Sequence, residues 1–277
     1  MIKIFKVFFL LGFMKKRGAR KQLKKIRKKP IIALAQIRYS GVTKENVEKI
    51  IKYIKIAKTK GADIVCFPEA CLSIRDRRDV FKLSHHFIKE IEETCKRNKI
   101  WCIISDDMII QGKAYSVALV INREGKDVGG YKKIHLSGDN DLVNAGKRIR
   151  VFNTDFGKIS IVICWDLIFA ELFKRIKKAG AEIVFCPAQW HYQEESYNKK
   201  FKRRDLKLLR ALISARAFEN FYFVALCNPL TNRKDLVSYS AITSPHKILK
   251  EIINKEGIIT AEINLSEIKK MHKLYKI

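Results

Sequence analysis

Short apolar runs alternate along this chain with longer segments in which apolar side chains recur at helical spacing. Each run is bounded by turn residues or a proline, which is typical of buried strands. Strands are therefore expected at residues 31–36, 63–69, 100–104, 114–121, 158–163, 182–186 and 221–227, with two or three more between 238 and 263.

The segments with helical spacing lie between these runs. Thr43 is expected to be the N-cap of the first helix, which ends before Gly61. Further helices are expected at about 80–97 and 201–219, and a hairpin turn at 122–125. Because strands and helices alternate early while hairpins dominate late, the pattern predicts an α/β fold with a mixed sheet covered by helices. Reactive groups are then expected at the ends of strands.

The stretch 157–171, GKISIVICWDLIFAE, joins a buried strand to a helix-like segment through Cys164. A thiol at a sharp turn from strand to helix has free backbone N–H groups beside it. A nucleophile needs this geometry if the same backbone is to hold an oxyanion. The other interpretation is structural, since free cysteine is among the most buried residue types.

Length and composition favour one well-packed domain with an unusually basic surface. The chain has 277 residues, 47% of them hydrophobic, and a formal net charge of +29. Lys and Arg outside the first thirty residues are spread over several expected helices and interleaved with acids, which favours a solvated lysine-rich surface. Adhesion to nucleic acid or anionic lipid is the alternative. No zinc-finger spacing and no aromatic RNA-binding motif occur, so no specific nucleic acid is expected.

Residues 1–30 form a basic N-terminal extension that we expect to lie outside the fold, with the domain spanning 31–277. The extension carries twelve Lys or Arg and no acid, and its apolar run at 4–14 is too short to span a bilayer. Its main charge follows the apolar run, unlike a signal peptide. Two interpretations stay open: an anchor making weak contact with an anionic membrane surface, or an upstream start codon with Met14 as the true beginning.

Cysteine usage indicates a reducing compartment. Seven cysteines occur, no pair has CxxC spacing, and most lie in apolar runs that resemble strands. The six histidines are not clustered with them, so a metal site is not expected. We expect a cytoplasmic protein, with association to a membrane surface as the alternative.

Three reactive side chains fall at strand ends or just after them: Glu69 in FPE, Lys133 in YKKIHL, and Cys164 in CWD. Together these motifs resemble those of the carbon-nitrogen hydrolase (nitrilase) superfamily, in its amidase and N-carbamoyl amidohydrolase branch. The resemblance covers about residues 31–275 and extends to GAEIVFCPAQW at 180–190 and ARAFEN at 215–220. The spacing of the family motif selects Lys133 over its neighbour Lys132.

The resemblance implies a four-layer αββα sandwich that assembles as a dimer or larger homo-oligomer through helix faces. It implies a cysteine hydrolase of non-peptide carbon-nitrogen bonds, acting on a small linear amide or N-carbamoyl compound and releasing ammonia or amine. Cys164 would attack to give a thioacyl-enzyme and Glu69 would move protons. Lys133 and the Trp165 backbone N–H would stabilise the oxyanion. No metal or organic cofactor is implied.

The chain departs from its relatives in ways that bear on substrate binding. Many relatives carry a second glutamate before the glycine that matches Gly146, whereas here Asp141 is the candidate replacement. Trp165, Asp141 and Trp190 are the expected substrate-binding residues. Asp166 stands where enzymes that hydrolyse nitriles usually have glutamate, so nitrile hydrolysis is not expected. His135 is expected to position its loop, and Arg216 with Glu219 to form a structural ion pair.

A different class of function stays open on the same fold. The missing second glutamate is compatible with a non-catalytic binding protein. The basic N-terminal extension is compatible with a binding protein that is tethered to a membrane. The intact set of Glu69, Lys133 and Cys164 favours the enzyme.

Overall fold

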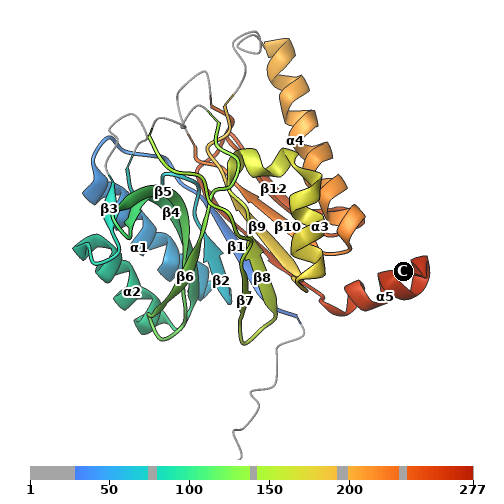
Figure 1. The fold of residues 1–277 in the computed structure, drawn as a ribbon, viewed down its shortest axis with the longest axis horizontal. Coiled ribbons are helices and arrows are strands. Elements are labelled where there is room, and N and C mark those ends of the chain that lie inside the picture. The colour runs from blue at the N-terminus through green and yellow to red at the C-terminus, as the bar shows by residue number, and fades with distance from the viewer. Residues whose placement is uncertain (1–28, 74–79, 138–141, 192–198, 231–235, 277) are drawn as a thin grey trace, which may run out of the picture.

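The computed structural model describes residues 29–73, 80–137, 142–191, 199–230 and 236–276. These residues form two stacked sheets enclosed by helices (Figure 1). Figure 1 shows α1 and α2 on the left of the sheets and α3 and α4 on the right. This arrangement confirms the predicted four-layer αββα sandwich.

The first sheet has the order β13-β1-β2-β4-β5-β6, with β3 paired to β4, and the second has the order β12-β11-β10-β9-β8-β7. The strands of the first sheet are β1 (Ile31–Gln36), β2 (Ile64–Cys66), β3 (Phe81–Lys82), β4 (Trp101–Ile110), β5 (Lys113–Ile121), β6 (Asp127–Lys132) and β13 (Gly257–Glu262). Those of the second are β7 (Val151–Asn153), β8 (Lys158–Ile161), β9 (Ile183–Pro187), β10 (Phe223–Cys227), β11 (Tyr239–Thr243) and β12 (Ile248–Ile253). The helices are α1 (Thr43–Thr59), α2 (His86–Asn98), η2 (Cys164–Ile168, a 3₁₀ turn), α3 (Ala170–Lys178), α4 (Lys199–Asn220) and α5 (Ser266–Tyr275).

The sandwich is held by apolar side chains that alternate between two cores. Ile32 and Leu34 of β1 belong to the core shared with the second sheet, whereas Ala33 and Ala35 belong to the core under α1 and α2. Successive residues of a strand point to opposite faces, so a strand buried on both faces reads as a continuous apolar run. This explains why the strand pattern was visible in the sequence.

The fold brings the ends of several strands together. β1, β2 and β4 are parallel in the first sheet, and β8, β9 and β10 are parallel in the second. β6 is antiparallel to β5, which is antiparallel to β4, so β6 runs in the same direction as β4. The residues that follow β2, β6, β8 and β9 therefore meet at one edge of the sandwich, as expected for an α/β site.

Several boundaries differ from the predictions: β2 is shorter than expected, β4 runs on to Ile110, and the starts of two helices have local causes. α1 begins at Thr43 itself, and its N-cap Val42 makes no side-chain capping bond. The Asn46 side chain instead accepts from the Ser40 N–H at 2.7 Å and donates to the Ser40 carbonyl at 2.9 Å, which fixes the entry to the helix. The expected helix at 80–97 starts late, because Phe81 pairs with Met108 in the sheet and the His85 side chain caps α2 by accepting from the Phe87 N–H.

Helix α5 was not predicted, and most of the basic extension lies outside the described residues. The ten residues of α5 follow the last strand. The predictions for the basic extension cannot be compared with the structure, because residues 1–28 lie outside the described part of the chain. Within the described ranges, no helix combines the length and hydropathy needed to cross a membrane.

Candidate active site

Glu69 lies just beyond β2, and its carboxylate is fixed on both oxygens. Oε1 lies 3.0 Å from the Lys133 ammonium and Oε2 accepts the Gln189 backbone N–H at 3.0 Å. The Glu69 carbonyl accepts the Tyr39 hydroxyl. Ala70, the next residue, has φ +54°, in the left-handed region that non-glycine residues rarely adopt. Such strain persists only where the surroundings over-determine it, as at functional sites.

Lys133 is the first residue after β6, and it is buried with only 1% of its surface exposed. Its N–H donates to the Ser116 carbonyl at 2.9 Å, and its own carbonyl accepts the Gly146 N–H at 2.6 Å. A Cβ at Gly146 would collide with the Lys132 carbonyl oxygen, so only glycine fits this crossing. The backbone on both sides thus holds the lysine against Glu69. A buried ammonium needs such a partner.

Cys164 stands at the turn from β8 into η2. Its φ is +46°, so the nucleophile candidate also adopts the strained left-handed conformation. Arg216 of α4 closes the far end of the turn by donating to the carbonyls of Leu167 at 3.0 Å and Ile168 at 2.9 Å. The Trp165 N–H belongs to the first turn of η2, where backbone donors have no intrahelical acceptor.

Asp166 joins the cysteine turn to the lysine loop. One of its oxygens accepts the Tyr131 hydroxyl at 2.7 Å and the Ile163 N–H at 3.0 Å. The other accepts the His135 N–H at 2.9 Å and lies 2.7 Å from His135 Nδ1. Burial, followed by the nearby Asp166 charge, raises the pKa of Tyr131 well above its usual value. Since the Asp166 carboxylate contacts both segments, it fixes the turn that carries Cys164 relative to the loop that carries Lys133.

A small cavity of about 60 Å³ opens at this point. Its lining comprises Lys133, Ser137, Cys164, Trp165, Gln189, Trp190 and His191. The two tryptophan rings lie 5.8 Å apart, and the Asn228 side chain accepts the Trp190 N–H at 3.0 Å. A cavity needs about 10–15 Å³ of such volume to hold one water, so this cavity has room for about four water-sized groups.

A buried thiol that shares a small cavity with an ammonium, itself paired with a carboxylate, is suited to nucleophilic attack on a small carbonyl compound. A model of the family described as "Carbon-nitrogen hydrolase" matches residues 31–273. The chain belongs to the carbon-nitrogen hydrolase family.

Individual relatives agree with this assignment to the carbon-nitrogen hydrolases. The chain is 26% identical over 238 residues to the "2-oxoglutaramate amidase" of Bacillus subtilis, covering 82% of this chain and 87% of that protein. It is 27% identical over 256 residues to the "Omega-amidase NIT2" of Xenopus tropicalis, covering 84% and 88%. A carbon-nitrogen hydrolase structure from Helicobacter pylori has the same fold, with a TM-score of 0.81 at 18% identity over 90% of this chain and 94% of that one.

In this carbon-nitrogen hydrolase, the structure brings together most of the residues singled out in the sequence. Glu69 and Lys133 form an ion pair, and Lys133, Cys164, Trp165 and Trp190 line one cavity. Asp141 lies outside the described residues. The ion pair between Arg216 and Glu219 is confirmed at 3.2 Å, and all seven cysteines are free and buried.

Sequence reasoning missed Gln189, which is 2% exposed and lines the cavity of the carbon-nitrogen hydrolase site. Its side-chain Oε1 is buried and, among the described residues, accepts no hydrogen bond. A buried acceptor without a partner is costly, so an exception calls for an explanation. The available signal was its position directly before Trp190 at the end of an apolar run.

Proposed function

We propose that this chain is an amidase that hydrolyses small linear compounds with a terminal carboxamide group through a thioacyl intermediate on Cys164. The observation that carries the proposal is the cavity that both Cys164 and Lys133 line, together with the hydrogen bond from Lys133 to the buried Glu69 carboxylate. The amidase names of the two relatives described above support the same reaction class.

In the first half of the reaction, Glu69 takes the proton of the Cys164 thiol while the sulfur forms a bond to the amide carbon. The carbonyl oxygen becomes an oxyanion, which the Lys133 ammonium and the Trp165 backbone N–H stabilise. Protonated Glu69 then gives its proton to the amide nitrogen as the carbon-nitrogen bond breaks. Ammonia leaves, and a thioester remains on Cys164.

In the second half, Glu69 takes a proton from a water molecule whose oxygen attacks the thioester carbon. The carbon-sulfur bond breaks, a carboxylic acid forms, and the thiol is restored by the proton held on Glu69. Because Glu69 is held by Lys133 and by the Gln189 N–H, it keeps one orientation in both halves.

The cavity supports a terminal carboxamide as the group that is recognised. A carboxamide nitrogen carries two N–H donors, and the Oε1 atom of Gln189 is a buried acceptor with no hydrogen bond inside the described ranges. A nitrile has no such donor, which agrees with the expectation from Asp166. A linear amide and an N-carbamoyl compound both end in a CONH₂ group, so both belong to the proposed class. The small volume disfavours bulky acyl groups near the sulfur.

The test combines an ammonia-release assay with intact-mass spectrometry on a pool of small ω-amides, simple amides and N-carbamoyl amines. Wild-type protein should release ammonia and show a mass increase equal to one acyl group, and Cys164→Ala should do neither. Cys95→Ala is the matched control, since Cys95 is a buried cysteine of α2 that does not line the cavity. Ammonia release by Cys164→Ala would contradict the proposal. No turnover by wild type across the pool would favour the binding protein instead.

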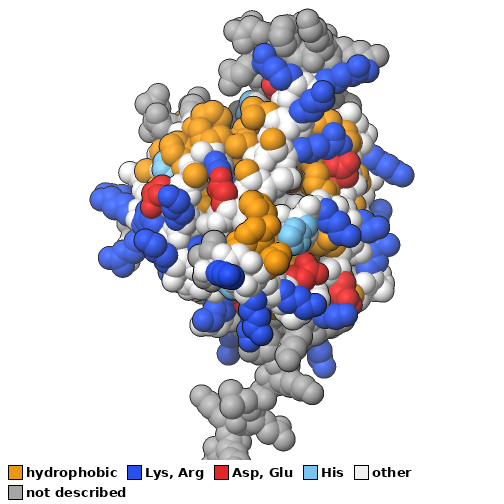
Figure 2. Space-filling view, turned by 90° about the vertical axis from the view of Figure 1, so that its right-hand side faces the viewer, with side chains coloured by type: hydrophobic (Ala, Val, Ile, Leu, Met, Phe, Trp, Pro, Cys, Tyr) orange, Lys and Arg blue, Asp and Glu red, His pale blue; other side chains and the backbone are white. Residues whose placement is uncertain are grey.

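We also propose assembly as a homo-oligomer through a helix face. Phe218 of α4 and the α5 residues Leu274 and Tyr275 are large apolar side chains that stay exposed, and the Phe218 and Tyr275 rings lie 5.7 Å apart. Figure 2 shows hydrophobic side chains gathered on the side of the molecule that carries these helices, among Lys and Arg. Light scattering should give a mass of at least two chains, and Leu274→Glu should reduce it. A monomeric wild type would contradict the proposal.

A further inference from the structure

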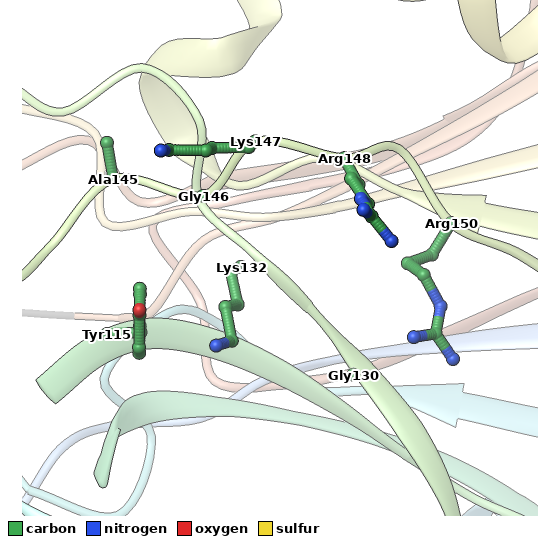
Figure 3. Close-up of a pocket in the computed structure, with 8 residues that line it drawn as sticks. All are labelled: Tyr115, Gly130, Lys132, Ala145, Gly146, Lys147, Arg148 and Arg150. Atoms are coloured by element: carbon green, nitrogen blue, oxygen red, sulfur yellow. The ribbon is translucent and has the colours of Figure 1, made fainter. Parts of the chain in front are cut away.

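A second cavity, of about 360 Å³, lies at the outer side of β6, apart from the carbon-nitrogen hydrolase site. It shares no lining residue with the small cavity around Cys164. The end of β6 provides Lys132, and the segment that crosses it after Gly146 provides Lys147, Arg148 and Arg150. Figure 3 shows these cationic side chains coming from the two segments around one hollow. Four cations thus surround one cavity, whose lining includes no carboxylate.

Several cations on the described surface are paired with carboxylates. Lys89 pairs with Glu92 at 2.7 Å, Arg210 with Glu251 at 2.8 Å, and Arg123 with both Asp63 and Asp155. By contrast, within the described ranges no carboxylate forms an ion pair with any of the four pocket cations. A general excess of lysine gives cations spread over a surface, whereas four uncompensated cations facing one hollow repel one another and favour an anion between them.

Two of the cations are held in place by aromatic rings. The Lys132 ammonium lies 3.5 Å from the centre of the Tyr115 ring, and the Arg150 guanidinium lies 5.4 Å from that of Phe152. A Cβ at Gly129 would lie 2.8 Å from an Arg150 nitrogen, so the glycine leaves room for the guanidinium. Because these side chains are ordered before a ligand binds, binding loses less side-chain conformational entropy.

The geometry points to a binding site for a small phosphate-bearing anion at Lys132, Lys147, Arg148 and Arg150. A phosphate group offers several acceptor oxygens that suit the planar guanidinium forks, while a lysine adds a point charge. A diphosphate matches the number of cations better than a single carboxylate does. The site is independent of the amidase proposal, because none of its residues takes part in that reaction.

The pocket is nevertheless connected to the catalytic centre through the main chain. Gly146, which lines the pocket, donates its N–H to the Lys133 carbonyl at 2.6 Å. An anion bound between Lys132 and Arg148 would therefore contact the segment whose Gly146 N–H is hydrogen-bonded to the Lys133 carbonyl.

Isothermal titration calorimetry with inorganic pyrophosphate, in about 0.15 M salt to screen loose surface charge, tests the site. Wild-type full-length protein should bind one pyrophosphate per chain saturably, and the double variant Lys147→Gln, Arg148→Gln should bind at least about tenfold more weakly. The matched control is Lys52→Gln, Lys55→Gln, which removes two exposed cations from α1. The control should bind as wild type does. Unchanged melting temperatures would show that both double variants remain folded.

Two outcomes would overturn the inference. One is the absence of saturable pyrophosphate binding to wild type, and the other is an equal loss in the pocket and control variants. A second arm asks where the phosphate comes from, using sedimentation with vesicles that contain phosphatidic acid. Sedimentation that pyrophosphate prevents and that the pocket variant lacks assigns the site to a lipid headgroup. Pyrophosphate binding without such sedimentation assigns it to a soluble phosphate compound.

Discussion

Lys132 and Lys133 are adjacent in the chain, yet one is grouped with other cations and the other is paired with a carboxylate. Lys133 is 1% exposed and lies 3.0 Å from the Glu69 carboxylate. Lys132 is half-buried, lies against the Tyr115 ring and faces a pocket with three further cations. The two side chains diverge because successive residues at a strand end point to opposite faces.

The comparison shows that charge count alone says little about function. In the proposed catalytic centre, one buried cation is matched by one buried carboxylate, and the proposal makes this pair part of a site for an oxyanion that forms only during reaction. In the pocket, four cations that form no ion pair within the described ranges make up the proposed site for an anion that arrives already charged. The experiments that follow separate these two uses of lysine and arginine.

Replacing the thiol should have the largest effect, and it should be confined to the catalytic centre. Cys164→Ala is expected to lower amide turnover by at least about 10⁴-fold, because it removes the thiol that forms the thioester in the proposed reaction. Pyrophosphate binding should be unchanged, since Cys164 does not line the pocket. Ammonia release and calorimetry on the same preparation measure both. Loss of pyrophosphate binding would show that the two regions are not separate.

Removing the charge of each lysine in turn tests the comparison directly. Lys133→Met leaves the Glu69 carboxylate buried without its cation and should lower the free energy of unfolding by about 3–5 kcal/mol. Lys132→Met removes the contact between a partly exposed ammonium and the Tyr115 ring. It should lower the free energy of unfolding by about 1 kcal/mol or less. Urea denaturation of the two variants against wild type measures both. Equal losses would mean that Lys133 is not held as described.

The sequence supported the catalytic centre far better than the pocket, for a physical reason. Glu69 and Cys164 each follow an apolar run, so both could be placed at strand ends, whereas Lys133 was selected by the spacing of the family motif. The pocket depends on a crossing at Gly146 that brings Arg148 against Lys132, and nothing in local periodicity reports such a contact.

Other details escaped for similar reasons. The position of Gln189 before Trp190 was a signal for the site, but its buried Oε1, which accepts no hydrogen bond within the described ranges, is revealed only by packing. The start of α2 was misplaced because a pairing with distant Met108 outweighs the local helical pattern at Phe81.

The two regions should also differ in how stability depends on pH. Burial raises the pKa of Asp106 to about 7, although it accepts hydrogen bonds from Leu72 and Ser73 in the segment that follows Glu69. The folded protein then binds more protons than the unfolded chain between pH about 4 and about 7. The free energy of unfolding should fall as pH rises through that window, by up to about 4 kcal/mol.

Urea denaturation at several pH values checks this dependence. Asp106→Asn cannot titrate, so its stability should vary less between pH about 4 and about 7, whatever its absolute value. The pocket variant Lys147→Gln, Arg148→Gln should keep the wild-type slope, because neither side chain changes charge in this window. An unchanged slope in Asp106→Asn would assign the dependence to another group.

The smallest expected effect concerns the acceptor in the catalytic cavity. Gln189→Leu keeps a side chain of similar size but removes Oε1, so kcat/KM for a primary amide should fall by about 2–10-fold, the value of one hydrogen bond. The methyl ester of the same acid carries no N–H at the reacting carbonyl, and its hydrolysis should change little. Steady-state kinetics on the matched amide and ester give the ratio. Equal losses for both would mean that Gln189 shapes the cavity and does not bind the amide nitrogen.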